Sequence, residues 1–172
     1  MPASELLPRS HDFHRRLRQL AAAFIGLCGV YQTVVGLYFM ALRPALLPED
    51  VRFLAIGLAS LKTGAPRLET WLHLVFVVLG GQMAAVGALV VGSALQIFHA
   101  QVRNRRELVW LGAAGLLSVG TMAGVNFALQ SDFRWLLIAP GVAWSVGLAL
   151  ALASCLTAAA GKAGEPAWRG MT

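Results

Sequence analysis

Four long stretches of the chain contain no Asp, Glu, Lys or Arg. They run over residues 19–42, 70–102, 108–131 and 135–161. Each is longer than the roughly 20 residues that an α-helix needs to cross a hydrocarbon core of about 30 Å. Backbone polar groups must be paired inside a bilayer, which leaves helices or a closed barrel. The apolar residues run continuously and do not alternate, so the pattern excludes the barrel.

The composition agrees with membrane-spanning helices. The 172 residues are 58% hydrophobic and 13% charged, whereas a soluble domain has about 25% charged residues. We therefore predict an all-α fold, a four-transmembrane-helix bundle that forms one domain over residues 19–160. Its helices are expected at about 19–42, 71–98, 108–129 and 135–159. A basic lead-in (1–18), with Ser10 as a helix N-cap, should precede them, and a disordered tail (161–172) should follow.

The connection between the first two predicted spans is long and is bounded by prolines. Within it, Pro48, Glu49 and Asp50 form a typical helix start, because proline suits the first helical position and acids complement the positive end of the helix dipole. We expect a short helix at about 48–62 that lies on the outer membrane surface.

Basic residues are distributed unevenly between the two sides of such a bundle. Of the 14 Lys and Arg residues, nine fall in the two terminal tails and in the loop between the second and third helices. Cytoplasmic segments next to membrane helices are enriched in Lys and Arg, so both termini are expected in the cytoplasm. The net charge of +6 follows from this orientation. The lipid bilayer, and no nucleic acid, is therefore the expected partner.

Small residues recur at every fourth position in two of the spans. One set is Gly80, Ala84, Ala88 and Gly92, and the other is Gly141, Ser145, Ala149 and Ala153. Such spacing lets helix backbones approach closely, so both sets are expected to face neighbouring helices. The same faces could hold a second copy of the chain or a partner in a membrane complex.

Five polar residues are expected at one depth, near the outer ends of the second, third and fourth helices. They are Glu69, His73, Asn126, Asp132 and Arg134. Glu69 and His73 share a helix face and can pair. The cluster could be an acid–base or ligand site beneath the loop helix, or a network of interfacial salt bridges and caps. No nucleophile motif accompanies it, so no catalytic residue is assigned.

A second polar set is expected near the middle of the membrane, with one residue in each span. Its members are Gln32, Gln82, Thr121 (or Ser118) and Ser145. They could surround a ligand or water, or simply hydrogen-bond between helices. No charged residue lies inside a span, which disfavours pumps and proton-coupled carriers. His73 and His99 lie roughly 39 Å apart along one helix and cannot share a haem iron, so neither a cofactor nor a metal is predicted.

Several short strings resemble those of a group of small bacterial four-helix membrane proteins of uncharacterised function, loosely DoxX-like. They are Leu46-Leu47-Pro48-Glu49-Asp50, Trp71-Leu72, Leu79-Gly80-Gly81, Val125-Asn126-Phe127 and Ser131-Asp132-Phe133. The resemblance covers roughly residues 30–140. It implies a multi-pass protein of the bacterial inner membrane and carries no activity with it.

Two hypotheses for the function remain open. The chain could be a non-catalytic accessory or scaffold subunit that acts through its small-residue faces. Alternatively, it could bind, or act as an enzyme on, an apolar molecule such as a quinone or lipid at the outer face. A tightly packed bundle favours the first hypothesis, and a lipid-accessible cavity favours the second.

Overall fold

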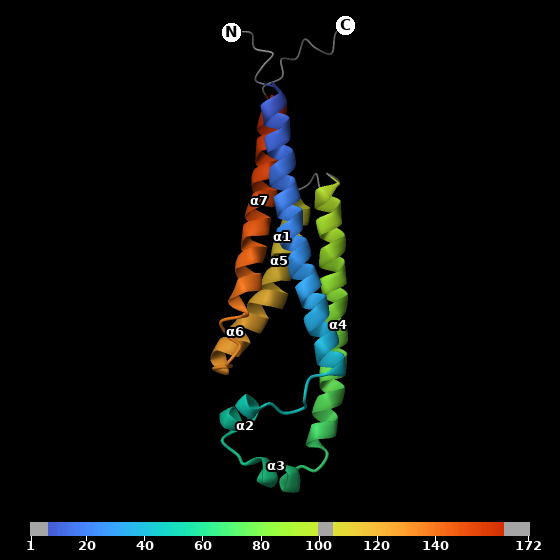
Figure 1. The fold of residues 1–172 in the computed structure, drawn as a ribbon, viewed down its shortest axis with the longest axis vertical. Helices are drawn as coiled ribbons and strands as arrows, with labels where there is room; N and C mark the ends of the chain where they lie inside the picture. Colours follow the sequence, from blue (N-terminus) through green and yellow to red (C-terminus); the bar gives the residue numbers. More distant parts are fainter. Residues whose placement is uncertain (1–6, 100–104, 164–172) are drawn as a thin grey trace.

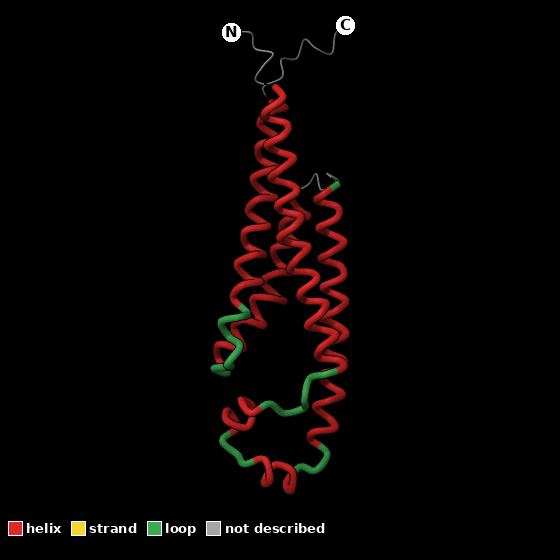
Figure 2. Tube along the Cα trace, viewed as in Figure 1, coloured by secondary structure: helices red, strands yellow, loops and turns green. Residues whose placement is uncertain are grey.

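The computed structural model describes residues 7–99 and 105–163, and within these ranges every regular element is a helix (Figures 1 and 2). The elements are α1 (Leu7–Ala41), α2 (Pro48–Leu54), α3 (Leu58–Gly64), α4 (Leu68–Phe98), α5 (Arg105–Gly115), the π-helical segment η2 (Leu116–Gly120), α6 (Thr121–Ala128) and α7 (Ile138–Ala163). Among the described residues, four helical segments are long and apolar enough to cross a membrane. The prediction of an all-α bundle of four such helices is confirmed.

Helix α1 is central to the fold and packs against both α4 and α7. Helix α5 packs against α7, whereas α4 and α5 make few direct contacts. Figure 1 shows that α1 begins beside the end of α7, while α2 and α3 lie at the opposite end of the molecule. The four spans therefore form two arms, α1 with α4 and α5–α6 with α7, which diverge toward α2.

Glycines bring the backbones of α1 and α4 into direct contact. A Cβ on Gly36 would lie 2.5 Å from the backbone nitrogen of Ala84, and a Cβ on Gly80 would lie 2.5 Å from the carbonyl oxygen of Gly36. Further along, a Cβ on Gly29 would lie 2.9 Å from the carbonyl oxygen of Gly87. Such a distance requires residues that lack a side chain, as is common where membrane helices cross.

The α4 residues at this contact do not follow a spacing of four. They are Gly80, Ala84, Gly87, Val91 and Ala94. Steps that alternate between four and three residues keep one face toward a neighbour, whereas a step of four alone turns that face by about 40° each time. The predicted stripe is therefore right for Gly80 and Ala84. It is wrong for Ala88, which is exposed, and for Gly92, where a Cβ would meet no atom within 4 Å.

The same correction applies to α7. Ser145 and Ala149 of the predicted stripe are exposed, whereas Trp144, Gly147 and Ala151 are buried. These buried positions again alternate steps of three and four residues.

Helix α7 packs along the part of α1 that ends at about Cys28 and lies farther from α2. A Cβ on Gly147 would lie 2.8 Å from Cγ1 of Ile25, which is fully buried. The thiol of Cys28 donates to the carbonyl oxygen of Pro140 at 3.4 Å. Pro140 lies in the first turn of α7, so α1 extends beyond α7 toward α2.

Several boundaries differ from those predicted. Helix α1 begins at Leu7, so Ser10 lies inside it and is not an N-cap. The single loop helix expected at 48–62 is two helices, because Ala55 adopts the left-handed conformation with φ of 53° and ends α2. The last span begins at Ile138 and extends to Ala163. Most of the predicted disordered tail, residues 164–172, lies outside the described residues.

The third span is not one continuous α-helix. Gly115, the last residue of α5, packs directly against the indole of Trp144 from α7, which a Cβ at that position would strike. The π-helical turn η2 follows at once. Ser118 within η2 donates to the carbonyl oxygen of Ala114 at 2.6 Å, which satisfies one backbone group of this irregular turn.

Candidate functional site

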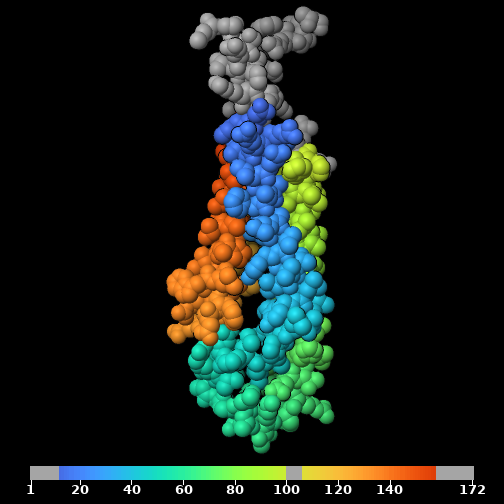
Figure 3. Space-filling model, in the orientation of Figure 1, coloured from blue at the N-terminus to red at the C-terminus, as the bar shows by residue number. Residues whose placement is uncertain are grey.

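The loop helix α2 is attached to the turn between α6 and α7. The Glu49 carboxylate accepts a hydrogen bond from the Ser131 hydroxyl at 3.1 Å and one from the Asp132 backbone N–H at 3.3 Å. Arg52 pairs with the Asp132 carboxylate at 3.3 Å. Figure 3 shows an opening between α1 and the start of α7 (orange), with α2 (teal) beneath it. These contacts, which we call the α2 latch, connect the two arms where they are farthest apart.

Arg43 fixes the other side of the loop. Its guanidinium lies over the ring of Phe76 at 3.7 Å from the ring centre and 3.7 Å from the carboxylate of Asp50. Burial lowers the pKa of Arg43, and the negative charge of Asp50 opposes that shift. Asp50 also accepts a hydrogen bond from the backbone N–H of Leu47 at 2.8 Å, which caps the start of α2.

The predicted outer cluster is not a single site, because its members have separate partners. Glu69 pairs with Lys62 of α3 at 3.2 Å and not with His73, which is exposed. Asp132 belongs to the α2 latch. Asn126 donates to the carbonyl oxygen of Met122 on its own helix at 2.9 Å. The guanidinium carbon of Arg134 lies 6.0 Å from the ring centre of Trp135, its neighbour in sequence.

These contacts match the salt-bridge and capping alternative better than a ligand site. The ion pairs of Lys62 with Glu69 and of Arg52 with Asp132 have exposed side chains, so each contributes at most about 1 kcal/mol. A cavity of about 480 Å³ does lie between α2 and the α6–α7 turn, with Arg52, Asp132 and Arg134 among its lining residues.

The predicted midplane layer does not converge either. Gln32 is buried, and its side-chain oxygen has no hydrogen-bond partner among the described residues. Gln82, Thr121 and Ser145 are exposed. The Ser145 hydroxyl donates to the carbonyl oxygen of Gly141 at 2.9 Å. A hydroxyl satisfied on its own helix has no need of a partner on a neighbouring one.

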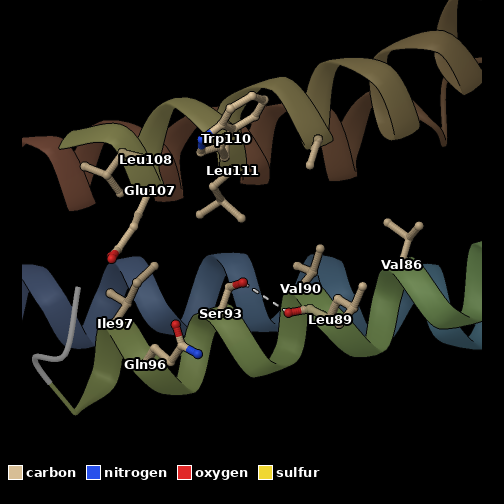
Figure 4. A pocket seen from close by; sticks show the side chains of 11 residues that line it. Val86, Leu89, Val90, Ser93, Gln96, Ile97, Glu107, Leu108, Trp110 and Leu111 are labelled. Atoms are coloured by element: carbon tan, nitrogen blue, oxygen red, sulfur yellow. Dashed lines mark hydrogen bonds between the residues drawn. The ribbon is translucent and has the colours of Figure 1, made fainter. Parts of the chain in front are cut away.

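A groove between α4 and α5 is the candidate binding site that sequence reasoning missed. Its volume is about 410 Å³. Its lining residues are Val86, Leu89, Val90, Ser93, Gln96 and Ile97 of α4, with Glu107, Leu108, Trp110, Leu111 and Ala114 of α5. Figure 4 shows Val90 and Ile97 of α4 facing Leu111 of α5 across the gap. The groove exists because α4 belongs to the arm formed with α1, whereas α5 belongs to the arm formed with α7.

The groove is apolar along most of its length and polar at one end. Val86 lies toward its apolar end, and Glu107 lies at the other, where Figure 4 shows its carboxylate directed toward α4. Gln96 and Ser93 are the polar α4 residues near this end. The Ser93 hydroxyl donates to the carbonyl oxygen of Leu89 at 3.1 Å, whereas the Gln96 side chain is exposed. The groove can therefore accept an elongated apolar body with a polar group at one end.

Comparison with known proteins adds no relative to this picture. No protein-family model matches the chain, and neither a curated protein nor a solved structure gives a significant match.

Proposed function

We propose that this chain is a multi-pass protein of the bacterial inner membrane, with both termini in the cytoplasm, that holds an apolar molecule of the lipid or quinone class in the groove between α4 and α5. The groove carries the proposal. The resemblance to small bacterial membrane proteins supports the choice of membrane, and the distribution of Lys and Arg supports the orientation.

The size and lining of the groove suit such a ligand. Its volume of about 410 Å³ falls within the range of small-molecule sites, roughly 300–1,000 Å³. The apolar walls match an acyl or isoprenoid chain. Gln96 offers both hydrogen-bond donors and an acceptor, and Glu107 offers a carboxylate, so the polar end can take a hydroxyl, an amine or a ring carbonyl. The ligand would enter sideways from the bilayer, because the groove opens between two helices.

An accessory or scaffold role is the second candidate. The exposed surface of α4 opposite α1 favours it, since helices in membrane complexes associate through exposed faces that contain small residues. This role and the groove are compatible, because a scaffold subunit can also retain a lipid.

Filling the groove tests the proposal. Ala114 lines the groove, whereas Ala88 is exposed on α4 away from it. Wild-type protein, Ala114→Phe and Ala88→Phe should be extracted into polymer nanodiscs without detergent, and their lipids and quinones analysed by mass spectrometry. We expect one molecular class to be enriched over the bulk membrane in the wild type and in Ala88→Phe, and to fall to the bulk level in Ala114→Phe.

Two results would contradict the proposal. One is a wild-type lipid and quinone content that equals that of the surrounding membrane. The other is an enrichment that survives in Ala114→Phe while the protein remains folded, because the retained molecule would then lie elsewhere.

A further inference from the structure

The surface of α4 that faces away from α1 is a regular seam of exposed residues. Its central members are Val75, Val78, Gln82, Ala85, Leu89 and Gly92, with Gln96 one step beyond. All but Gly92 are exposed, and a Cβ on Gly92 would meet no atom within 4 Å. The steps alternate between three and four residues, which is the heptad spacing with which one helix packs along another. We call this set the α4 seam.

Gln82 is the residue of the seam that needs a partner. It lies near the middle of α4 (Leu68–Phe98), so a spanning α4 places it deep in the hydrocarbon. Its side chain is exposed and has no hydrogen-bond partner in the part of the chain that the structure describes. An amide without a partner is strongly disfavoured there, because hydrocarbon offers neither donors nor acceptors.

The geometry of a membrane identifies the partner. Two copies of one chain insert in the same orientation, so two α4 helices in contact are parallel and related by a two-fold axis along the membrane normal. Such an axis places each seam residue opposite the same residue of the other copy. A glutamine amide both donates and accepts, so Gln82 complements itself. Gln96 lies two heptads further along and meets its own copy in the same register.

We infer that the chain forms a parallel homodimer through the α4 seam, with the Gln82 amides hydrogen-bonded across the two-fold axis. Ala85 and Gly92 flank this contact and let the two helices approach closely. A polar residue at a single heptad position is also the feature that fixes register in helix pairs. The inference is argued from the seam and Gln82, although Leu89 and Gln96 of the seam also line the groove between α4 and α5.

Single cysteines test the geometry of the seam. Cys155→Ala removes the less buried native thiol, and Cys28 can stay because it is buried. In this background Ala85→Cys should form an intermolecular disulfide in native membranes. Ala88→Cys, which is exposed on the same helix outside the seam, should not. Equal crosslinking at the two positions, or a seam cysteine that crosslinks a different protein, would refute the homodimer.

The amide is tested by fluorescence energy transfer between labelled copies in liposomes as lipid dilutes the protein. Gln82→Leu removes the amide from both copies and should raise the dimer dissociation constant by about eightfold, the effect of losing two interhelical hydrogen bonds of average strength in lipid. Ala85→Leu should weaken the dimer sterically, and Ala88→Leu should not. The inference is wrong if wild-type protein is monomeric at every lipid dilution, or if Gln82→Leu dimerises as tightly as the wild type.

Discussion

Replacing Gly80 by alanine isolates the energy of a close backbone contact between α1 and α4. The new Cβ would lie 2.5 Å from the carbonyl oxygen of Gly36 and 2.9 Å from the backbone nitrogen of Met40. Neither backbone atom can move without α1, so the two helices must separate by several tenths of an ångström along the contact. Overpacking of this kind costs about 1–3 kcal/mol.

Gly81 provides the matched control. It is the next residue of the same helix, and a Cβ there would meet no atom within 4 Å. Both substitutions raise helix propensity equally, by up to about 1 kcal/mol. The difference between the two variants is therefore the packing energy alone, and Gly80→Ala should be about 1–3 kcal/mol less stable than Gly81→Ala.

Stability can be measured by reversible SDS-induced unfolding in mixed micelles, with tryptophan fluorescence as the signal. Gly36→Ala should repeat the loss, because its Cβ would lie 2.5 Å from the backbone nitrogen of Ala84. If Gly80→Ala and Gly81→Ala unfold at the same SDS fraction, the close contact between α1 and α4 does not exist in the membrane, and the described packing is wrong.

Three further predictions concern the orientation of the chain, the contact between α5 and α7, and the α2 latch. A reporter fused to the C-terminus should be active only if it functions in the cytoplasm, and a periplasmic signal would overturn the proposed orientation. Gly115→Ala should lower stability by about 1–3 kcal/mol in the SDS assay, because the new methyl group would strike Trp144, whereas Gly124→Ala, next to open space, should not. Glu49→Leu should broaden the spin-label distance distribution between α4 and α6, because it removes both latch bonds of Glu49, whereas Glu69→Leu should not; equal broadening in both variants would contradict a role for the α2 latch.

The helices could be predicted from the sequence because the membrane restricts which residues a span can contain, and that restriction is visible in a single sequence. A span must exclude charges over its whole length, and this pattern is local. The start of α2 was equally local, since Pro48 and the acids after it stabilise a helix end whatever surrounds it. The break at Ala55 was not visible, because alanine carries no local signal for the left-handed conformation that ends α2.

The candidate sites were harder to predict because they depend on which helices touch. Glu69 and His73 share a helix face, and nothing in the spacing indicated that Lys62 would pair with Glu69 instead. The groove depends on α4 and α5 packing on different arms, which no local pattern encodes. The two packing faces of α4, however, could have been predicted from its sequence. Steps of four and three, in place of four alone, identify both the contact with α1 and the seam on the opposite side.

The groove and the α4 seam share two residues, and this links the two proposals. Leu89 and Gln96 line the groove and also belong to the seam. A second α4 packed on the seam would therefore lie at the edge of the groove and narrow its opening to lipid. Linkage then requires that a retained molecule and dimerisation change each other's equilibrium by the same factor. Ala114 lines only the groove, and Ala85 belongs only to the seam. Ligand retention and the dimer dissociation constant, measured for Ala114→Phe, Ala85→Leu and the double variant, therefore give that factor.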